Sequence, residues 1–121
     1  MIEGEEFSCV FTTKLGQNVL LYAAEMDGFE SKEIITEPVN WSDLKSIEVK
    51  TNRKVQNYYQ DCNFKKKQSK WWLQSFLVGI ENIVVGTRND EGVVFELEEL
   101  KVSDIPKSCK VKKKNKLFFN L

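Results

Sequence analysis

A change in the spacing of the aromatic and apolar residues, in the middle of the chain, constrains the fold more than any other feature. From about Val55 to Gly79, aromatic and apolar residues recur at helical spacings, and Gly79 is a natural residue for the end of a helix. The segments on both sides alternate instead, and they are rich in β-branched and aromatic residues, as strands are. A chain of 121 residues with this order predicts a single α/β (α+β) domain, in which one long helix packs across a mixed sheet.

The strands around that helix are predicted from short alternating segments. They span residues 5–12, 19–27, 45–51, 82–88 and 93–100. Turn signals at residues 14–18 and 89–92 join the first two strands and the last two strands into hairpins. Residues 28–44 show no sustained period and contain Pro38, so they are predicted to form a loop. We expect a core domain over residues 1–104, followed by a lysine-rich tail over residues 105–121.

The residue types that are missing restrict the chemistry. The chain has no histidine, which excludes Ser-His-Asp and Cys-His catalysis and histidine-ligated zinc within it. Cys9, Cys62 and Cys109 are odd in number and far apart, so we predict three free thiols. Hydrolytic chemistry would therefore depend on carboxylates, lysine, tyrosine, water and a hard metal ion.

The formal net charge of zero hides a strong segregation of charge along the chain. Residues 1–50 carry a net charge of −6, residues 51–80 of +5 and residues 81–104 of −5, and residues 105–121 add six lysines. An acidic region can hold a cation while a basic helix meets phosphate groups. The alternative is ordinary solvated surface charge, and it also applies to the lysines of the tail from Lys107 to Lys116.

The hydrophobic runs of the sequence are short. The runs at residues 19–24 and 76–80 do not approach the roughly 20 residues of a membrane helix. The first residues are acidic, whereas a signal peptide begins with a basic region and continues with an apolar one. We therefore expect an intracellular protein without a membrane partner.

Charged residues occupy same-face positions on two predicted strands. Glu25 and Asp27 lie two positions apart, as do Glu48 and Lys50. If the strands 19–27 and 45–51 are neighbours, three carboxylates and one ammonium group converge. Oxygen ligands suit Mg²⁺ or Mn²⁺, and the backbone carbonyl of Val49 could add a further ligand. The alternative for each pair is the exposed edge of an amphipathic strand.

The predicted helix adds a polar face to this arrangement. Lys67, Lys70 and Gln74 are three and four positions apart, so they share one face, which suits a single-stranded phosphate backbone. The other face is predicted to be core and consists of Phe64, Trp71 and Ser75, with Trp72 and Phe76 beside them.

Two levels of resemblance follow from these motifs. The spacing D-x20-E-x-K, from Asp27 to Lys50, resembles the PD-(D/E)XK nuclease superfamily. The order AEMDG, IEVKT and KKQSKWWLQSFLVGIENIVVGTR resembles the decapping exoribonuclease (DXO-like) family more specifically, from about Glu5 to Leu100. The resemblance implies a PD-(D/E)XK nuclease-like core that is incomplete, because family members are considerably longer.

The resemblance also implies an activity and roles for individual residues. Family members are Mg²⁺- or Mn²⁺-dependent enzymes that act on RNA 5′ ends carrying a triphosphate, a cap or an NAD cap, and many degrade RNA from 5′ to 3′. Fungal members bind a nuclear 5′-3′ exoribonuclease, which implies a nuclear rather than a cytoplasmic protein. The residues carried over are Glu25, Asp27 and Glu48 as metal ligands, Lys50 and Gln74 at the scissile phosphate, and Lys67 and Lys70 on the RNA-facing side.

The departures from the family pattern leave alternatives open. A further metal-ligating glutamate of the family lies upstream of the first matched strand, and we expect this chain to lack it. The chain is then a fragment or a truncated relative with an exposed apolar face that would favour association. It is a metal-dependent RNA 5′-end hydrolase, a weakly active or inactive relative that binds RNA ends or a protein partner, or a DNA nuclease of the same superfamily.

Overall fold

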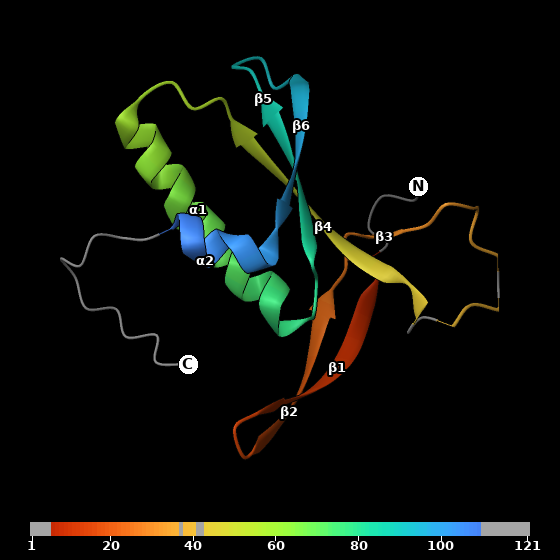
Figure 1. Cartoon of the computed structure of the whole chain (residues 1–121). Coiled ribbons are helices and arrows are strands. Elements are labelled where there is room, and N and C mark those ends of the chain that lie inside the picture. The colour runs from red at the N-terminus through yellow and green to blue at the C-terminus, as the bar shows by residue number, and fades with distance from the viewer. Residues whose placement is uncertain (1–5, 37, 41–42, 110–121) are drawn as a thin grey trace.

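The structure of the chain is a computed structural model that describes residues 6–36, 38–40 and 43–109 (Figure 1). A two-stranded sheet is formed by β1 (Ser8–Leu15) and β2 (Asn18–Glu25), and a four-stranded sheet has the order β3-β4-β5-β6. The four strands are β3 (Gly28–Glu30), β4 (Lys45–Arg53), β5 (Asn82–Arg88) and β6 (Val94–Lys101). The helices are α1 (Tyr58–Leu77), the 3₁₀ turn η2 (Val102–Asp104) and the short α2 (Ile105–Ser108).

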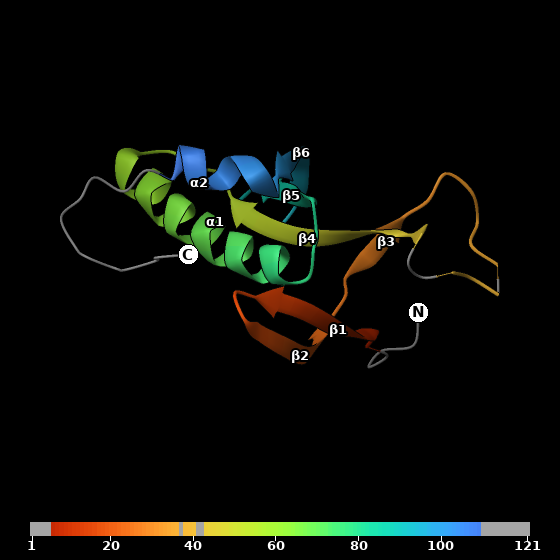
Figure 2. The ribbon, with the colours of Figure 1, turned by 60° about the horizontal axis from the view of Figure 1, so that its bottom comes forward.

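The larger sheet is mixed, as predicted. Strands β4 and β5 are parallel, with Glu48 opposite Ile83, and α1 is the crossover between them. Strands β3 and β6 pair antiparallel with β4 and β5 respectively. Because a parallel pair requires such a crossover, α1 covers one face of the sheet (Figure 2).

Local capping signals define both ends of α1. The side chain of Asn57 accepts a 3.0 Å hydrogen bond from the backbone N–H of Gln60 at the N-terminus. At the C-terminus Gly79 has φ +73°, and the N–H groups of Ile80 and Gly79 donate to the carbonyls of Ser75 (2.9 Å) and Phe76 (3.3 Å). These two bonds form a Schellman motif, so the predicted helix and its glycine cap are confirmed, with the helix a few residues shorter than expected.

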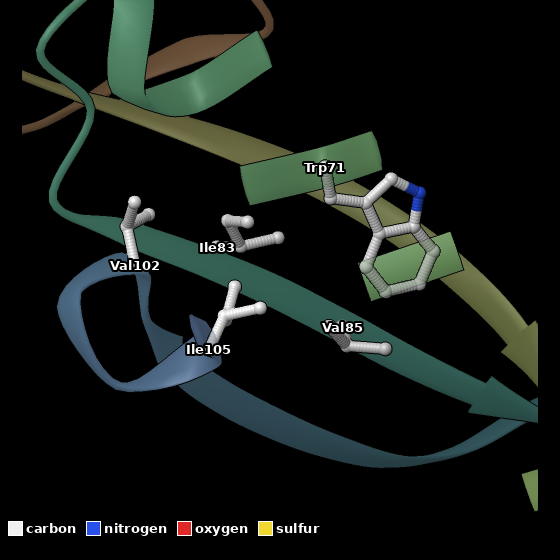
Figure 3. Packing of buried hydrophobic residues seen from close by; sticks show 5 residues of the cluster. All are labelled: Trp71, Ile83, Val85, Val102 and Ile105. Atoms are coloured by element: carbon white, nitrogen blue, oxygen red, sulfur yellow. The ribbon is translucent and has the colours of Figure 1, made fainter. Parts of the chain in front are cut away.

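The main hydrophobic core lies between α1 and β5 and is closed by the C-terminal elements (Figure 3). Trp71 from α1 packs with Ile83 and Val85 from β5, while Val102 and Ile105 come from η2 and α2. The helix residues Phe64 and Trp72 are partly buried against this cluster. The prediction of Phe76 as core is wrong, because its side chain is 51% exposed and stacks on Trp72, with the ring centroids 5.2 Å apart.

Three short elements, β3, η2 and α2, lie in segments whose sequence did not predict them. Strand β3 lies within the expected loop 28–44; with three residues it is too short to show a period. Helix α2 contains Pro106 in its first turn, where proline is tolerated. Its residue Ile105 is 3% exposed. The hydrophobic core therefore includes the first residue of the predicted tail, which we expected to begin at residue 105. Most of that tail lies outside the described residues.

Three further features of the described chain concern its cysteines, its helices and its apolar surface. All three cysteines are free thiols, and Cys109 Sγ lies 3.4 Å from the carbonyl oxygen of Lys65. None of the helices in the described ranges has the length and apolar character needed to cross a bilayer. Exposed apolar side chains are found on β2 and β6, where Leu21 is 74% and Leu97 is 72% exposed.

Candidate active site

The path of the chain from β2 into β3 places Asp27 beside the central strand. Strand β2 ends at Glu25, Met26 turns inward and is 5% exposed, and Asp27 directly precedes β3. Gly28 of β3 pairs with Ile47 of β4, so the position before it lies next to Glu48. The condition that strands 19–27 and 45–51 are neighbours is met at Asp27 but not along β2, because β2 pairs with β1 and the unpredicted β3 lies beside β4.

A hydrogen bond fixes the carboxylate of Asp27 to β4. Its Oδ2 accepts a 2.8 Å hydrogen bond from the backbone N–H of Val49. The N–H and C=O of one strand residue point to the same side. The carbonyl of Val49, which the sequence suggested as a ligand, therefore faces the edge where Asp27 lies.

Glu48 and Lys50 form an ion pair on the face of β4 that is turned towards α1. The side chains are 12% and 26% exposed, and Lys50 Nζ contacts Glu48 Oε1 directly. Asn52, two positions further on the same face, is also buried, at 8% exposed. The predicted same-face arrangement of Glu48 and Lys50 is therefore confirmed, and partial burial strengthens the attraction between the two charges.

A pocket of about 410 Å³ joins the predicted residues. It is lined by Glu25, Asp27, Glu48, Lys50 and Gln74, and by Tyr22, Ala23, Ala24, Leu77 and Val78. The first group comes from the end of β2, the junction before β3, β4 and the last turn of α1. The second group was not predicted from the sequence, although its members lie within four positions of Glu25 or Gln74.

The basic residues of α1 lie beyond this pocket. Lys67 Nζ donates a 3.2 Å hydrogen bond to Asn52 Oδ1 on β4, and Lys70 is exposed one turn before Gln74. The shared polar face of α1 therefore leads away from the pocket along β4. Further along, the guanidinium of Arg53 binds Asp90 and holds the pKa of that carboxyl below its ordinary value.

The donor types of the pocket suit a hard divalent cation. Glu25, Asp27 and Glu48 offer carboxylate oxygens, which Mg²⁺ and Mn²⁺ prefer. Within the described residues, no three His, Cys, Asp or Glu side chains are gathered closely enough to hold an ion together. Glu48 is turned to Lys50 and Asp27 to the Val49 N–H, so metal binding requires carboxylates to rotate within the pocket.

These features define a class of protein. A mixed sheet, a crossover helix and the D-x20-E-x-K residues around one pocket form the core of a PD-(D/E)XK nuclease. Residues 1–119 match the family described as RAI1-like PD-(D/E)XK nuclease. The chain belongs to this family, which confirms the resemblance found in the sequence.

Relatives with known names are similar over most of this chain. The decapping nuclease RAI1 of Neurospora crassa is 35% identical over 104 residues, which are 84% of this chain and 24% of that protein. The decapping and exoribonuclease protein Rai1 of Drosophila melanogaster is 38% identical over 113 residues, which are 88% of this chain and 29% of that protein. The chain thus spans between 24% and 29% of the length of these two relatives.

Solved structures agree with this fold. Rai1 of Scheffersomyces stipitis superposes with a TM-score of 0.75 at 33% identity, covering 87% of this chain and 27% of that one. Rai1 of Candida albicans in complex with pU5-Mn²⁺ has a TM-score of 0.74 at 27% identity, covering 84% of this chain and 26% of that one. The described fold is therefore the fold of the matching quarter of these structures.

Proposed function

We propose that this chain carries the metal-binding core of a hydrolase that acts on RNA 5′ ends. The observation that supports it most is the meeting of Glu25, Asp27, Glu48, Lys50 and Gln74 around one pocket. These residues come from four separate places in the fold. Surface charge alone gives no reason for such a meeting, whereas phosphoryl chemistry needs carboxylates, a cation and a phosphate-binding side chain at one point.

The positions of these groups at the pocket support the following roles. Mg²⁺ or Mn²⁺ would be held by Glu25, Asp27 and Glu48, with the Val49 carbonyl. Such an ion would supply Lewis acidity that lowers the pKa of a water molecule and polarises the phosphoryl group. Lys50 and Gln74 contact the oxygens of the scissile phosphate, and partial burial of Lys50 keeps its charge effective. Lys67 and Lys70 contact the RNA backbone beyond the pocket.

The substrate and setting extend the same proposal. The names of the relatives favour decapping, and a Candida albicans Rai1 structure contains pU5 and Mn²⁺, so RNA with a 5′ phosphate group fits this class of site. We propose RNA carrying a 5′ triphosphate, a cap or an NAD cap as substrate, with 5′-3′ exonuclease activity as an additional reaction. A nuclear location and a nuclear 5′-3′ exoribonuclease as partner complete this proposal.

A second function has one observation in its favour. The three carboxylates line one pocket, but among the described residues no three His, Cys, Asp or Glu side chains lie close enough together to hold an ion, and Glu48 already pairs with Lys50. A relative that binds RNA ends or a protein without cleaving RNA would keep this arrangement. A DNA nuclease of the same superfamily is a third candidate.

One assay distinguishes these functions. The chain is incubated with Mn²⁺ and with triphosphorylated, capped or NAD-capped RNA and a DNA of the same sequence, beside the Glu48→Gln variant. Release of the 5′ group from RNA, abolished in Glu48→Gln, supports the proposal. Salt-sensitive RNA binding without release, unchanged in Glu48→Gln, favours the binding protein, and cleavage of the DNA alone favours the DNA nuclease.

A further inference from the structure

The β1–β2 hairpin brings Glu25 to the pocket, although it is not part of the sheet that carries Glu48 and Lys50. Its open end is fixed to the larger sheet. The Phe7 ring packs edge-on against Phe29 of β3, with the centroids 5.6 Å apart, and Asp27 binds the Val49 N–H. Because a two-stranded hairpin is only marginally stable by itself, a second contact away from this end helps to hold its orientation.

A second contact of the hairpin lies at the wall of the pocket that β2 and the end of α1 form. The hydroxyl of Tyr22, in the middle of β2, donates a hydrogen bond to the backbone carbonyl of Leu77, the last residue of α1. The hairpin and the helix end lie side by side in both views (Figures 1 and 2). Both residues also line the pocket.

This hydrogen bond also satisfies a carbonyl group at the end of α1. The last carbonyls of an α-helix lack partners within the helix. The Schellman motif satisfies the carbonyls of Ser75 and Phe76, and the Tyr22 hydroxyl satisfies that of Leu77. The ring of Tyr22 is held in turn by stacking on Phe11 across the hairpin, with the centroids 5.9 Å apart.

We infer that Tyr22 is a positioning residue of the metal site. It lies three positions before Glu25 on β2, and its partner Leu77 lies three positions after Gln74 on α1. Joining these two residues fixes the distance across the pocket between the carboxylate of Glu25 and the amide of Gln74. Tyr22 acts through these two residues and leaves the chemistry to them. The inference rests on the proposed function.

Calorimetric titration of the whole chain with Mn²⁺ tests it. The Tyr22→Phe variant removes the hydroxyl but keeps the ring that stacks on Phe11. The matched control is Tyr59→Phe, which removes a hydroxyl from a tyrosine of α1 that is 74% exposed. We expect Tyr22→Phe to weaken Mn²⁺ binding roughly 3- to 10-fold, the size of one lost hydrogen bond, and Tyr59→Phe to leave it unchanged.

Thermal unfolding of the same variants separates positioning from stability. A structural role alone would lower the melting temperature of Tyr22→Phe while leaving its Mn²⁺ affinity, measured well below that temperature, at the wild-type value. That result overturns the inference and leaves the proposed function intact. If the folded wild-type chain binds no Mn²⁺, the proposed function fails, and the positioning role fails with it.

Discussion

The carboxylate of Asp27 accepts a 2.8 Å hydrogen bond from the backbone N–H of Val49, which lies 22 positions later in the chain. This bond connects the two halves of the D-x20-E-x-K pattern directly. The residues between Asp27 and Glu48 contain β3, the long connection that follows it and the start of β4.

Removing the charge of Lys50 tests the ion pair of the pocket. Because Glu48 is 12% exposed at its side chain, Lys50→Met leaves a mostly buried carboxylate without its partner. We expect the free energy of unfolding to fall by about 1–3 kcal/mol, measured by urea denaturation. Added Mn²⁺ should restore part of the loss, since a bound cation replaces the missing ammonium group.

The control for this prediction is Lys45→Met. Lys45 lies on the same strand as Lys50 and pairs with two exposed residues, Glu30 and Glu81. Its loss should therefore change stability little. Equal effects of Lys45→Met and Lys50→Met, with no response to Mn²⁺, would contradict the account of the pocket.

Much of the fold follows from the sequence because its signals are local. The helical period, the Gly79 cap and the hairpin turns predict their elements without distant contacts, whereas the Asn57 cap was not predicted. Strand β3 has no such signal, since its three residues are ordered by pairing with β4. Phe76 was assigned to the core from its spacing, but spacing cannot show where the covering layer of a sheet ends.

The candidate site, too, was predicted only in part from the sequence. The alternation of Glu48 and Lys50 along β4 gave their common face, because the period of a strand is local. We expected strand 19–27 to run beside strand 45–51, whereas β3 takes that place, since pairing between strands depends on the whole fold. The wall formed by Tyr22 and Leu77 was missed for the same reason: it requires the tilt of the hairpin against α1.

Ser75 offers a second test, within the core. Its side chain is fully buried on α1, and among the described residues no group forms a hydrogen bond with its hydroxyl. A buried hydroxyl without a partner is costly, so Ser75→Ala should raise the free energy of unfolding by about 1 kcal/mol. Urea denaturation measures this change.

Ser69→Ala is the matched control, because Ser69 is an exposed serine of the same helix. It reports the gain in helix propensity, about 0.5 kcal/mol at most, together with the loss of the exposed 3.1 Å hydrogen bond that the Ser69 hydroxyl donates to the Lys65 carbonyl. If Ser75→Ala is no more stabilising than Ser69→Ala, the hydroxyl of Ser75 has a partner in solution.

The helix cap next to the pocket gives a third prediction. Gly79 has φ +73°, and a Cβ there would meet nothing within 4 Å, so the cost of Gly79→Ala is backbone strain alone. We expect a loss of about 1–2 kcal/mol in the free energy of unfolding. Gly28→Ala is the comparison, since a Cβ at Gly28 makes an ordinary 3.6 Å contact with Ile47 and should cost less. A Gly79→Ala variant as stable as wild type would contradict the assigned cap.

The basic face of α1 predicts a salt dependence of RNA binding. If Lys67 and Lys70 contact phosphates, Lys67→Gln/Lys70→Gln should reduce the slope of log affinity against log salt by about 0.7 for each lost contact with a single strand. Fluorescence anisotropy with a short single-stranded RNA measures the slope. Lys65→Gln, which affects a lysine paired with Asp61, should leave it nearly unchanged. Equal slopes for both variants would show that Lys67 and Lys70 do not contact the phosphates of the RNA.

The most direct test of the central claim is calorimetric titration of the purified chain with Mn²⁺, beside the isosteric double variant Asp27→Asn/Glu48→Gln. Circular dichroism on both proteins establishes that they are folded. We expect micromolar binding by the wild-type chain and its loss in the double variant, because the carboxylates of Asp27 and Glu48 are proposed as ligands. Wild-type binding that survives in the double variant, or a folded wild-type chain that binds no Mn²⁺, would contradict it.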